Sequence, residues 1–255
     1  MPALTVTAIL SDAWNVYRLL FRRSIPIALV VYVLIDSLDL LDDLIDNDGV
    51  RISVVLIGGV LAFAGPVFVQ GALVRIVRNV HEGERPEPAR WLLSAAWRRL
   101  PSLAGASIVY AVGLLVGLLL LIVPGLIAAA RWALMAPAIM LEGRETMPAQ
   151  ARSRAIVAGE IDNGLGDRTR LALGVVVTSF LVTTAIPGAL GWIAYDYVWN
   201  WVTWALTVVV GALLAPYQAH VLSVLYYRLV DPQRPAVDPR VWAWPSVWCG
   251  IPESA

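Results

Sequence analysis

Long apolar segments constrain this chain more than any other feature of its sequence. Several runs reach or approach the roughly 20 residues that a helix needs to cross a hydrocarbon layer about 30 Å thick. We place six such spans, at 24–41, 52–75, 102–123, 125–141, 171–193 and 198–226. The chain is 59% hydrophobic and only 15% charged, which is typical of a membrane protein and leaves no room for a sizeable soluble domain. The predicted fold class is all-α, a polytopic membrane helix bundle with six transmembrane helices.

The basic residues predict how the bundle is oriented. Six spans put both termini on one side of the membrane, and 17 of the 19 basic residues fall on that side. By the positive-inside rule this side is cytoplasmic. Of the other two, Arg51 lies in an outer connection and Arg131 lies inside the fourth span. Because every basic residue is arginine, we infer a GC-rich bacterial genome. The predicted location is the bacterial plasma membrane, with cytoplasmic N- and C-termini.

An amphipathic segment that carries arginines precedes each pair of spans. The three segments are DAWNVYRLLFRRSIP, ARWLLSAAWRRLPS and PAQARSRAIVAGE. Helical spacing puts polar residues of the first two segments on one face: Asp12, Asn15, Arg18 and Arg22, then Arg90, Ser94 and Arg98. Trp14, Leu20 and Phe21 fall off that face in the first segment. Each segment predicts a helix that lies in the cytoplasmic interface with its arginines near anionic head groups.

A small residue followed by proline recurs in the second span of each pair. These are Gly65-Pro66, Ala136-Pro137 and Ala215-Pro216, and we predict helix breaks at the three prolines. The matched order favours an internal repeat of three units, each an interfacial helix and a hairpin, at about 5–87, 88–147 and 148–230. The alternative is that proline and glycine are simply frequent in membrane helices. Residues 1–230 would form one membrane domain, and residues 231–255 a cytoplasmic tail rich in proline and tryptophan.

One central stretch resembles a known family. VPGLIAAARWALMAPAIMLEG followed by ARSRAIVAGE, together with the later VLYYRL, is similar to the glycerophosphoryl diester phosphodiesterase membrane-domain proteins of bacteria. The layout matches over most of the chain, and only about 123–159 is motif-like. The resemblance implies a six-helix integral membrane fold in the plasma membrane. It implies no activity, because the catalytic phosphodiesterase domain and its histidine and carboxylate residues have no counterpart in this sequence.

Polar residues inside the spans are the first candidate sites. A charged side chain within a span is costly, so we expect Arg131 to have a partner, with Asp36 the first candidate and Asp39 the second. The alternative is that Arg131 reaches the outer surface without a partner. Gln70, Gln218 and His220 are expected to form hydrogen bonds between helices more often than to bind a ligand.

The acidic stretch DSLDLLDDLIDND is the second candidate. Asp39, Asp42, Asp43 and Asp46 would form an acidic outer stripe able to attract cations. The stretch also contains DDLID, which fits the DDxxD pattern of enzymes that hold a prenyl diphosphate through Mg²⁺. Such an enzyme needs a second acidic motif to complete the metal shell, and no other span carries paired carboxylates. We therefore expect this acidic stretch to be the water-exposed outer end of the first helix. We expect no resident metal or cofactor.

These observations favour a non-enzymatic membrane module with no catalytic residues. Its expected partners are membrane lipids, with a partner membrane protein or a second copy of the chain as further candidates. The net charge of zero gives no reason to expect nucleic acid. The alternative is a small transporter or channel component with an acidic outer mouth and a path lined by broken helices. The second alternative is a Mg²⁺-dependent membrane enzyme that uses DDLID.

Overall fold

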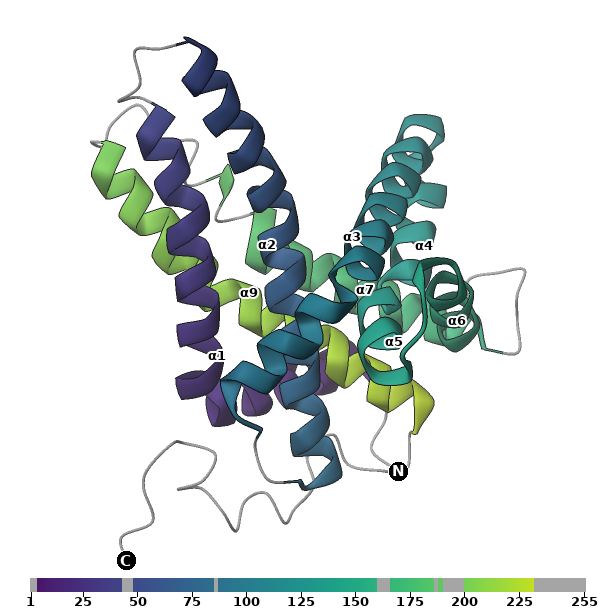
Figure 1. Cartoon of the computed structure of the whole chain (residues 1–255). Helices are drawn as coiled ribbons and strands as arrows, with labels where there is room; N and C mark the ends of the chain where they lie inside the picture. The colour runs from purple at the N-terminus through teal and green to yellow at the C-terminus, as the bar shows by residue number, and fades with distance from the viewer. Residues whose placement is uncertain are drawn as a thin grey trace, which may run out of the picture.

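The computed structural model describes residues 4–42, 48–84, 87–159, 166–185, 188–189 and 200–231. All regular structure in these residues is helical, which confirms the all-α prediction for the described part of the chain. The main elements are α1 (Val6–Asp42), α2 (Asp48–Glu82), α3 (Ala89–Leu120), α4 (Ile122–Trp132), α5 (Met135–Glu142), α6 (Thr146–Ala158), α7 (Asp167–Phe180), η1 (Leu181–Ala185) and α9 (Asn200–Val230). Figure 1 shows α1 beside α2, and α3 beside α4.

Five stretches of the described residues are long and apolar enough to cross a membrane. They are Ile52–Glu82, Ala89–Leu120, Ile122–Glu142, Asp167–Ala185 and Trp201–Val230. This result agrees with a membrane protein. The first predicted span, 24–41, is not among the five, and the side chains at its end lie outside those that the structure describes. The first predicted span, and with it the total of six, therefore stays a prediction, as does the hairpin layout.

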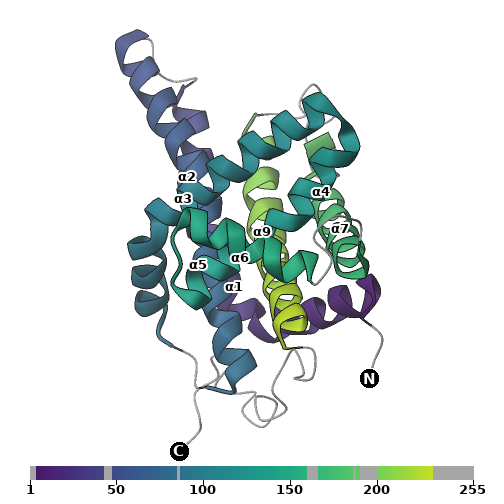
Figure 2. The same ribbon diagram turned by 90° about the vertical axis from the view of Figure 1, so that its right-hand side faces the viewer.

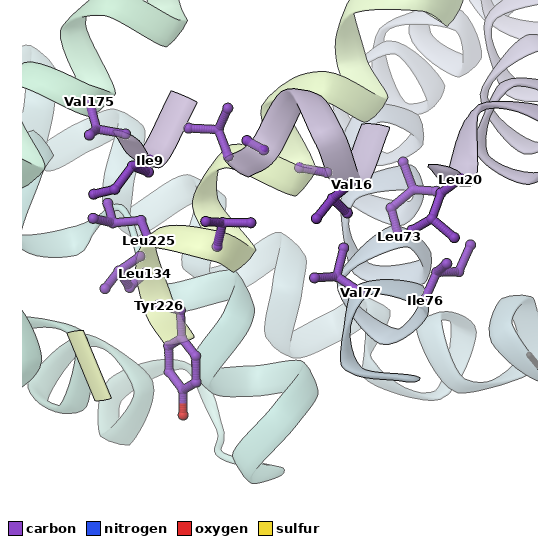
Figure 3. Close-up of a cluster of buried hydrophobic side chains, with 14 of the residues drawn as sticks. Ile9, Val16, Leu20, Leu73, Ile76, Val77, Leu134, Val175, Leu225 and Tyr226 are labelled. Atoms are coloured by element: carbon purple, nitrogen blue, oxygen red, sulfur yellow. The ribbon is translucent and has the colours of Figure 1, made fainter. Parts of the chain in front are cut away.

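The first amphipathic segment is not a separate helix, because α1 continues from it through Pro26 into the predicted span. Figure 2 shows the N-terminal part of α1 crossing the bottom of the bundle. One face of this part is buried in the main hydrophobic core, where Ile9, Val16 and Leu20 pack with residues of α2 and α9 such as Leu73 and Leu225 (Figure 3). The segment is therefore fixed mainly by burial against the bundle.

The exposed face of this segment agrees in part with the predicted one, since Asn15, Arg18 and Arg22 are exposed. Trp14 and Phe21, which were predicted to fall off that face, are exposed as well, whereas Asp12 is half-buried and accepts hydrogen bonds from Arg228 of α9. The prediction took polar residues as the marker of the outer face. At a membrane interface large aromatic side chains are also stable on the outside, since a ring can lie among the head groups.

The second amphipathic segment repeats this arrangement. It forms the first turns of α3, which also continues through a proline, Pro101. Leu92, Ala95 and Ala96 are buried, while Trp91 and Trp97 are exposed beside arginines. The third segment is a helix of its own, α6. Its aromatic-free outer side carries the exposed Arg154.

The predicted helix breaks at Pro66 and Pro216 are wrong, because α2 and α9 continue through both prolines. A proline inside a helix removes one hydrogen bond, and neighbouring helices can hold the rest of the helix in place. Only Pro137 follows an interruption: α4 ends at Trp132 and α5 begins at Met135. The fourth predicted span is therefore two helices.

A serine from α6 satisfies the main chain at this interruption. Ser153 is buried, and its hydroxyl donates to the carbonyl of Arg131 (2.7 Å) and accepts from the backbone N–H of Leu134 (3.1 Å). These main-chain groups lie where neither helix supplies their usual partners. The contact therefore joins α6 to the middle of the candidate membrane span Ile122–Glu142.

Two glycines let α3 and α4 pack closely as a hairpin. Leu121 is extended between the helices, and a Cβ added to Gly117 would lie 2.6 Å from the Cα of Gly125. A Cβ at Gly113 would lie 1.8 Å from the ring of Trp132. The absence of a side chain at Gly113 thus lets the ring of Trp132 pack against α3.

Candidate functional site

A cavity of about 560 Å³ lies among the helices that are long and apolar enough to span a membrane. Its walls come from α3, α4, α5, α7 and η1, and α2 and α9 each contribute to it as well. Most of the lining is apolar, with Leu103, Leu114, Leu126, Leu173, Val176 and Leu222 among the larger side chains. The volume lies in the range of about 300–1,000 Å³ that is common for sites that bind small molecules.

The cavity reaches the outer surface of the bundle. Leu118, Phe180 and Leu181 line it, and these residues are 40%, 50% and 48% exposed. They belong to stretches that are apolar enough to span a membrane. The opening therefore lies among side chains suited to contact with lipid tails.

Trp132 separates this cavity from a second, surface-exposed groove. The ring lines the cavity and also lines a groove of about 550 Å³ along α6, which contains Gln150 and Arg154. The basic side chain of Arg154 thus lines this groove and not the apolar cavity.

Two glutamines mark the polar end of the cavity. Gln70 of α2 and Gln218 of α9 line it, and both also line a smaller cavity of about 250 Å³. The smaller cavity is more polar, since Tyr32, Thr183 and Thr184 contribute to it. The structure therefore brings together two of the three polar residues that the sequence placed inside the spans, at the boundary between two adjoining cavities.

A π-helical turn presents the threonines to this boundary. Elements of this kind widen a helix by one residue per turn and often occur at functional sites. In η1 the hydroxyl of Thr183 donates to the carbonyl of Ser179 (2.7 Å) and is hydrogen-bonded to the side-chain amide of Gln218. The π-helical turn was not predicted from the sequence, and Thr183, Ser107 and Tyr110 were not among the candidate residues.

His220 lies elsewhere. It is fully buried between α9 and α1, where its Nε2 is 3.2 Å from the hydroxyl of Ser24, and it lines neither cavity. Two residues along an α-helix point about 200° apart, which separates His220 from Gln218. Helical spacing alone would therefore have predicted that His220 and Gln218 lie on different faces of the helix.

The structure does not test the other predicted residues. Arg131 is half-buried in α4, which packs mainly on α3, α7 and α6, and Asp36 is half-buried in α1. Their pairing stays a prediction. The side chains of Asp39 and Asp42 are outside those described, and Asp43 and Asp46 lie outside the described residues. Within the described ranges no three His, Cys, Asp or Glu side chains are grouped to hold a metal ion.

A charged cluster forms at the end of α5. Glu142 accepts hydrogen bonds from Arg152 of α6 (2.8 Å), from Arg144 (2.5 Å) and from the hydroxyl of Tyr226 in α9 (2.5 Å). The hydrogen bond to Glu142 raises the pKa of Arg152.

A second ion pair joins Arg75 and Glu87. It is bidentate, with N–O distances of 2.9 and 3.1 Å. The arginines were predicted to lie near lipid head groups. The structure shows that acidic residues bind several of them, among them Arg75, Arg144 and Arg152.

Comparisons with models of known families, with curated proteins and with solved structures found no match.

Proposed function

We propose that this chain is an integral protein of the bacterial plasma membrane that holds the apolar chain of a membrane lipid in the larger cavity without acting on it chemically. The observation that carries the proposal is the apolar cavity of about 560 Å³ that opens among lipid-facing side chains. A lipid tail can enter such an opening sideways from the bilayer, with no passage through water.

The topology proposed with it has six spans, as in the family that the sequence resembles, together with cytoplasmic termini and three repeated units. The distribution of the basic residues supports this orientation. In Figures 1 and 2 the last turns of α2 and α9 lie at the bottom of the bundle with the first half of α1. Exposed pairs such as Trp14 with Arg18 and Trp97 with Arg98 suit that end to an interface with anionic lipid. A partner protein or a second copy of the chain would also fit this module.

The test compares variants that fill the cavity with a variant that does not. Ala129 is buried and lines the cavity, so Ala129→Phe places a ring in the space where the lipid chain would lie. Ala62 of α2 is exposed and lines neither cavity, which makes Ala62→Phe the matched control. Lipids that remain bound after purification in mild detergent are counted by native mass spectrometry and identified after extraction.

We expect the unchanged protein and Ala62→Phe to retain lipid, and Ala129→Phe to lose most of it. Leu114→Trp fills another part of the cavity and repeats the test of lipid retention if Ala129→Phe does not fold. If a folded cavity-filling variant retains the same lipid to the same extent as the unchanged protein, the proposal is wrong.

A separate change distinguishes the two alternative functions. Replacing Asp42, Asp43 and Asp46 together by Asn should leave lipid retention unchanged. A change of cation flux in liposomes would favour the transporter, and a loss of prenyl-transfer turnover in the presence of Mg²⁺ would favour the enzyme.

A further inference from the structure

We propose that the lipid held in the cavity has a small, uncharged polar end, which lies between Gln70 and Gln218 and extends into the smaller cavity. The chemical class is a single-chain neutral lipid with hydroxyl or ester groups, such as a monoacylglycerol. This inference rests on the proposed function. It goes further in naming what distinguishes the bound lipid from the bulk of the membrane.

The apolar walls alone give little selectivity. A lipid tail in the bilayer is already in an apolar medium, so moving it into an apolar cavity does not gain the free energy of leaving water. Preference for one lipid over its neighbours must come from shape and from polar contacts. The polar contacts available here are at the boundary of the two cavities.

No charged side chain is among the residues that line the larger or the smaller cavity, within the part of the chain that the structure describes. A phosphate buried there would have no counter-charge, which is strongly unfavourable in a medium of low dielectric constant. Arg154 lies beyond Trp132 in the separate groove. The lining therefore disfavours the head groups of ordinary phospholipids.

The two glutamines are suited to a neutral polar group. Each amide offers two N–H donors and one carbonyl acceptor, so it can bind hydroxyl and ester oxygens alike. No hydrogen bond holds the side chain of Gln70 to another described residue, and Gln218 binds only Thr183 among them. Polar groups without partners are costly inside a membrane, and a ligand oxygen would satisfy them.

The smaller cavity supplies room beyond the glutamines. Its volume of about 250 Å³ and its tyrosine and threonine side chains suit a compact group with several oxygens. The larger cavity would then hold the chain, directed toward the opening at Phe180 and Leu181. One ligand would thus occupy both cavities, with its polar end at the two glutamines.

The experiment uses two lipids that differ only by one phosphate group: a monoacylglycerol and the same molecule phosphorylated on its glycerol. Binding to the full chain in detergent is measured by the change in tryptophan fluorescence, since Trp132 lines the cavity, and is checked by native mass spectrometry. Gln70→Met and Gln218→Met remove the amides at nearly constant volume. Gln150→Met, in the groove along α6, is the matched control.

We expect the unchanged protein to bind the neutral lipid at least about tenfold more tightly than the phosphorylated one, because an unpaired buried charge costs more than 1.4 kcal/mol. Each amide-removing variant should weaken binding of the neutral lipid by about 2- to 12-fold, the worth of one net hydrogen bond. Gln150→Met should change neither affinity.

Failure of the inference is distinguishable from failure of the proposed function. If both lipids bind equally well, or the phosphorylated lipid binds better, and Ala129→Phe abolishes their binding, the cavity holds lipid but the inference about the polar end is wrong. If the affinity for the neutral lipid is the same in both amide-removing variants as in the unchanged protein, the inference is also wrong. If neither lipid binds and Ala129→Phe retains its lipid in the earlier test, the proposed function itself is wrong.

Discussion

Replacing Glu142 by Gln should destabilise the protein, because three hydrogen bonds depend on the charge of this side chain. The carboxylate joins three elements, because its hydrogen-bond donors come from α6, α9 and the connection after α5. Glutamine keeps the shape of the side chain but removes the charge that attracts all three donors. The buried hydroxyl of Tyr226 would then face a neutral acceptor.

The size of the effect follows from the exposure of the donors. A hydrogen bond between the Tyr226 hydroxyl and a charged acceptor is worth about 1.5–3 kcal/mol. The Arg152 and Arg144 side chains are 36% and 42% exposed, and Glu142 is 19% exposed. Water screens such pairs, so each should add at most about 0.5 kcal/mol. Since glutamine can keep part of one hydrogen bond, we expect a loss of about 2–3 kcal/mol, or roughly 5–10 °C in Tm.

Thermal unfolding in detergent, followed by tryptophan fluorescence, measures this loss. The control is Glu145→Gln, an exposed acidic residue three positions away, which should stay within about 0.5 kcal/mol of the unchanged protein. Tyr226→Phe should be destabilising alone and should add little to Glu142→Gln, because both remove the same hydrogen bond. Full additivity of the two changes, or an unchanged Tm in Glu142→Gln, would refute this reasoning.

Two further changes test other contacts. Gly113→Ala should lower the free energy of unfolding by about 1–3 kcal/mol and shift the tryptophan emission, because the new Cβ overlaps the ring of Trp132. Gly59→Ala, where the added Cβ meets open space, should be neutral or stabilising by up to about 1 kcal/mol, and equal losses in both would contradict the packing argument. Exchanging charges, Arg131→Asp with Asp36→Arg, should restore the folded yield lost in either single variant if these residues pair, and absence of rescue would exclude the pair.

The helical class and most of the spans followed from the sequence because length and hydropathy alone determine them. The direction of each helix face followed only in part. In α1 the buried side is set by the shape of Ala13, Val16 and Leu20 against α2 and α9, whereas the prediction relied on where the polar residues fell. A polar residue marks the outer face well only when water surrounds the helix.

The candidate site was predictable in part. Gln70 and Gln218 stood out as amides in apolar runs, but their meeting depends on the packing of α2 against α9, which periodicity does not encode. Whether a helix continues through a proline also depends on the residues packed around it. Pro137 follows an interruption where Ser153 is available to bind the main chain, and Pro66 and Pro216 lie in continuous helices.

The contact of Ser153 with the interruption between α4 and α5 sets an order of events during biosynthesis. The main-chain groups of Arg131 and Leu134 are satisfied by a side chain 22 and 19 residues further along the chain. When Ile122–Glu142 first leaves the ribosome, that side chain follows it in the chain and has not yet emerged. The segment therefore reaches its final form only after α6 has emerged and has folded back onto it.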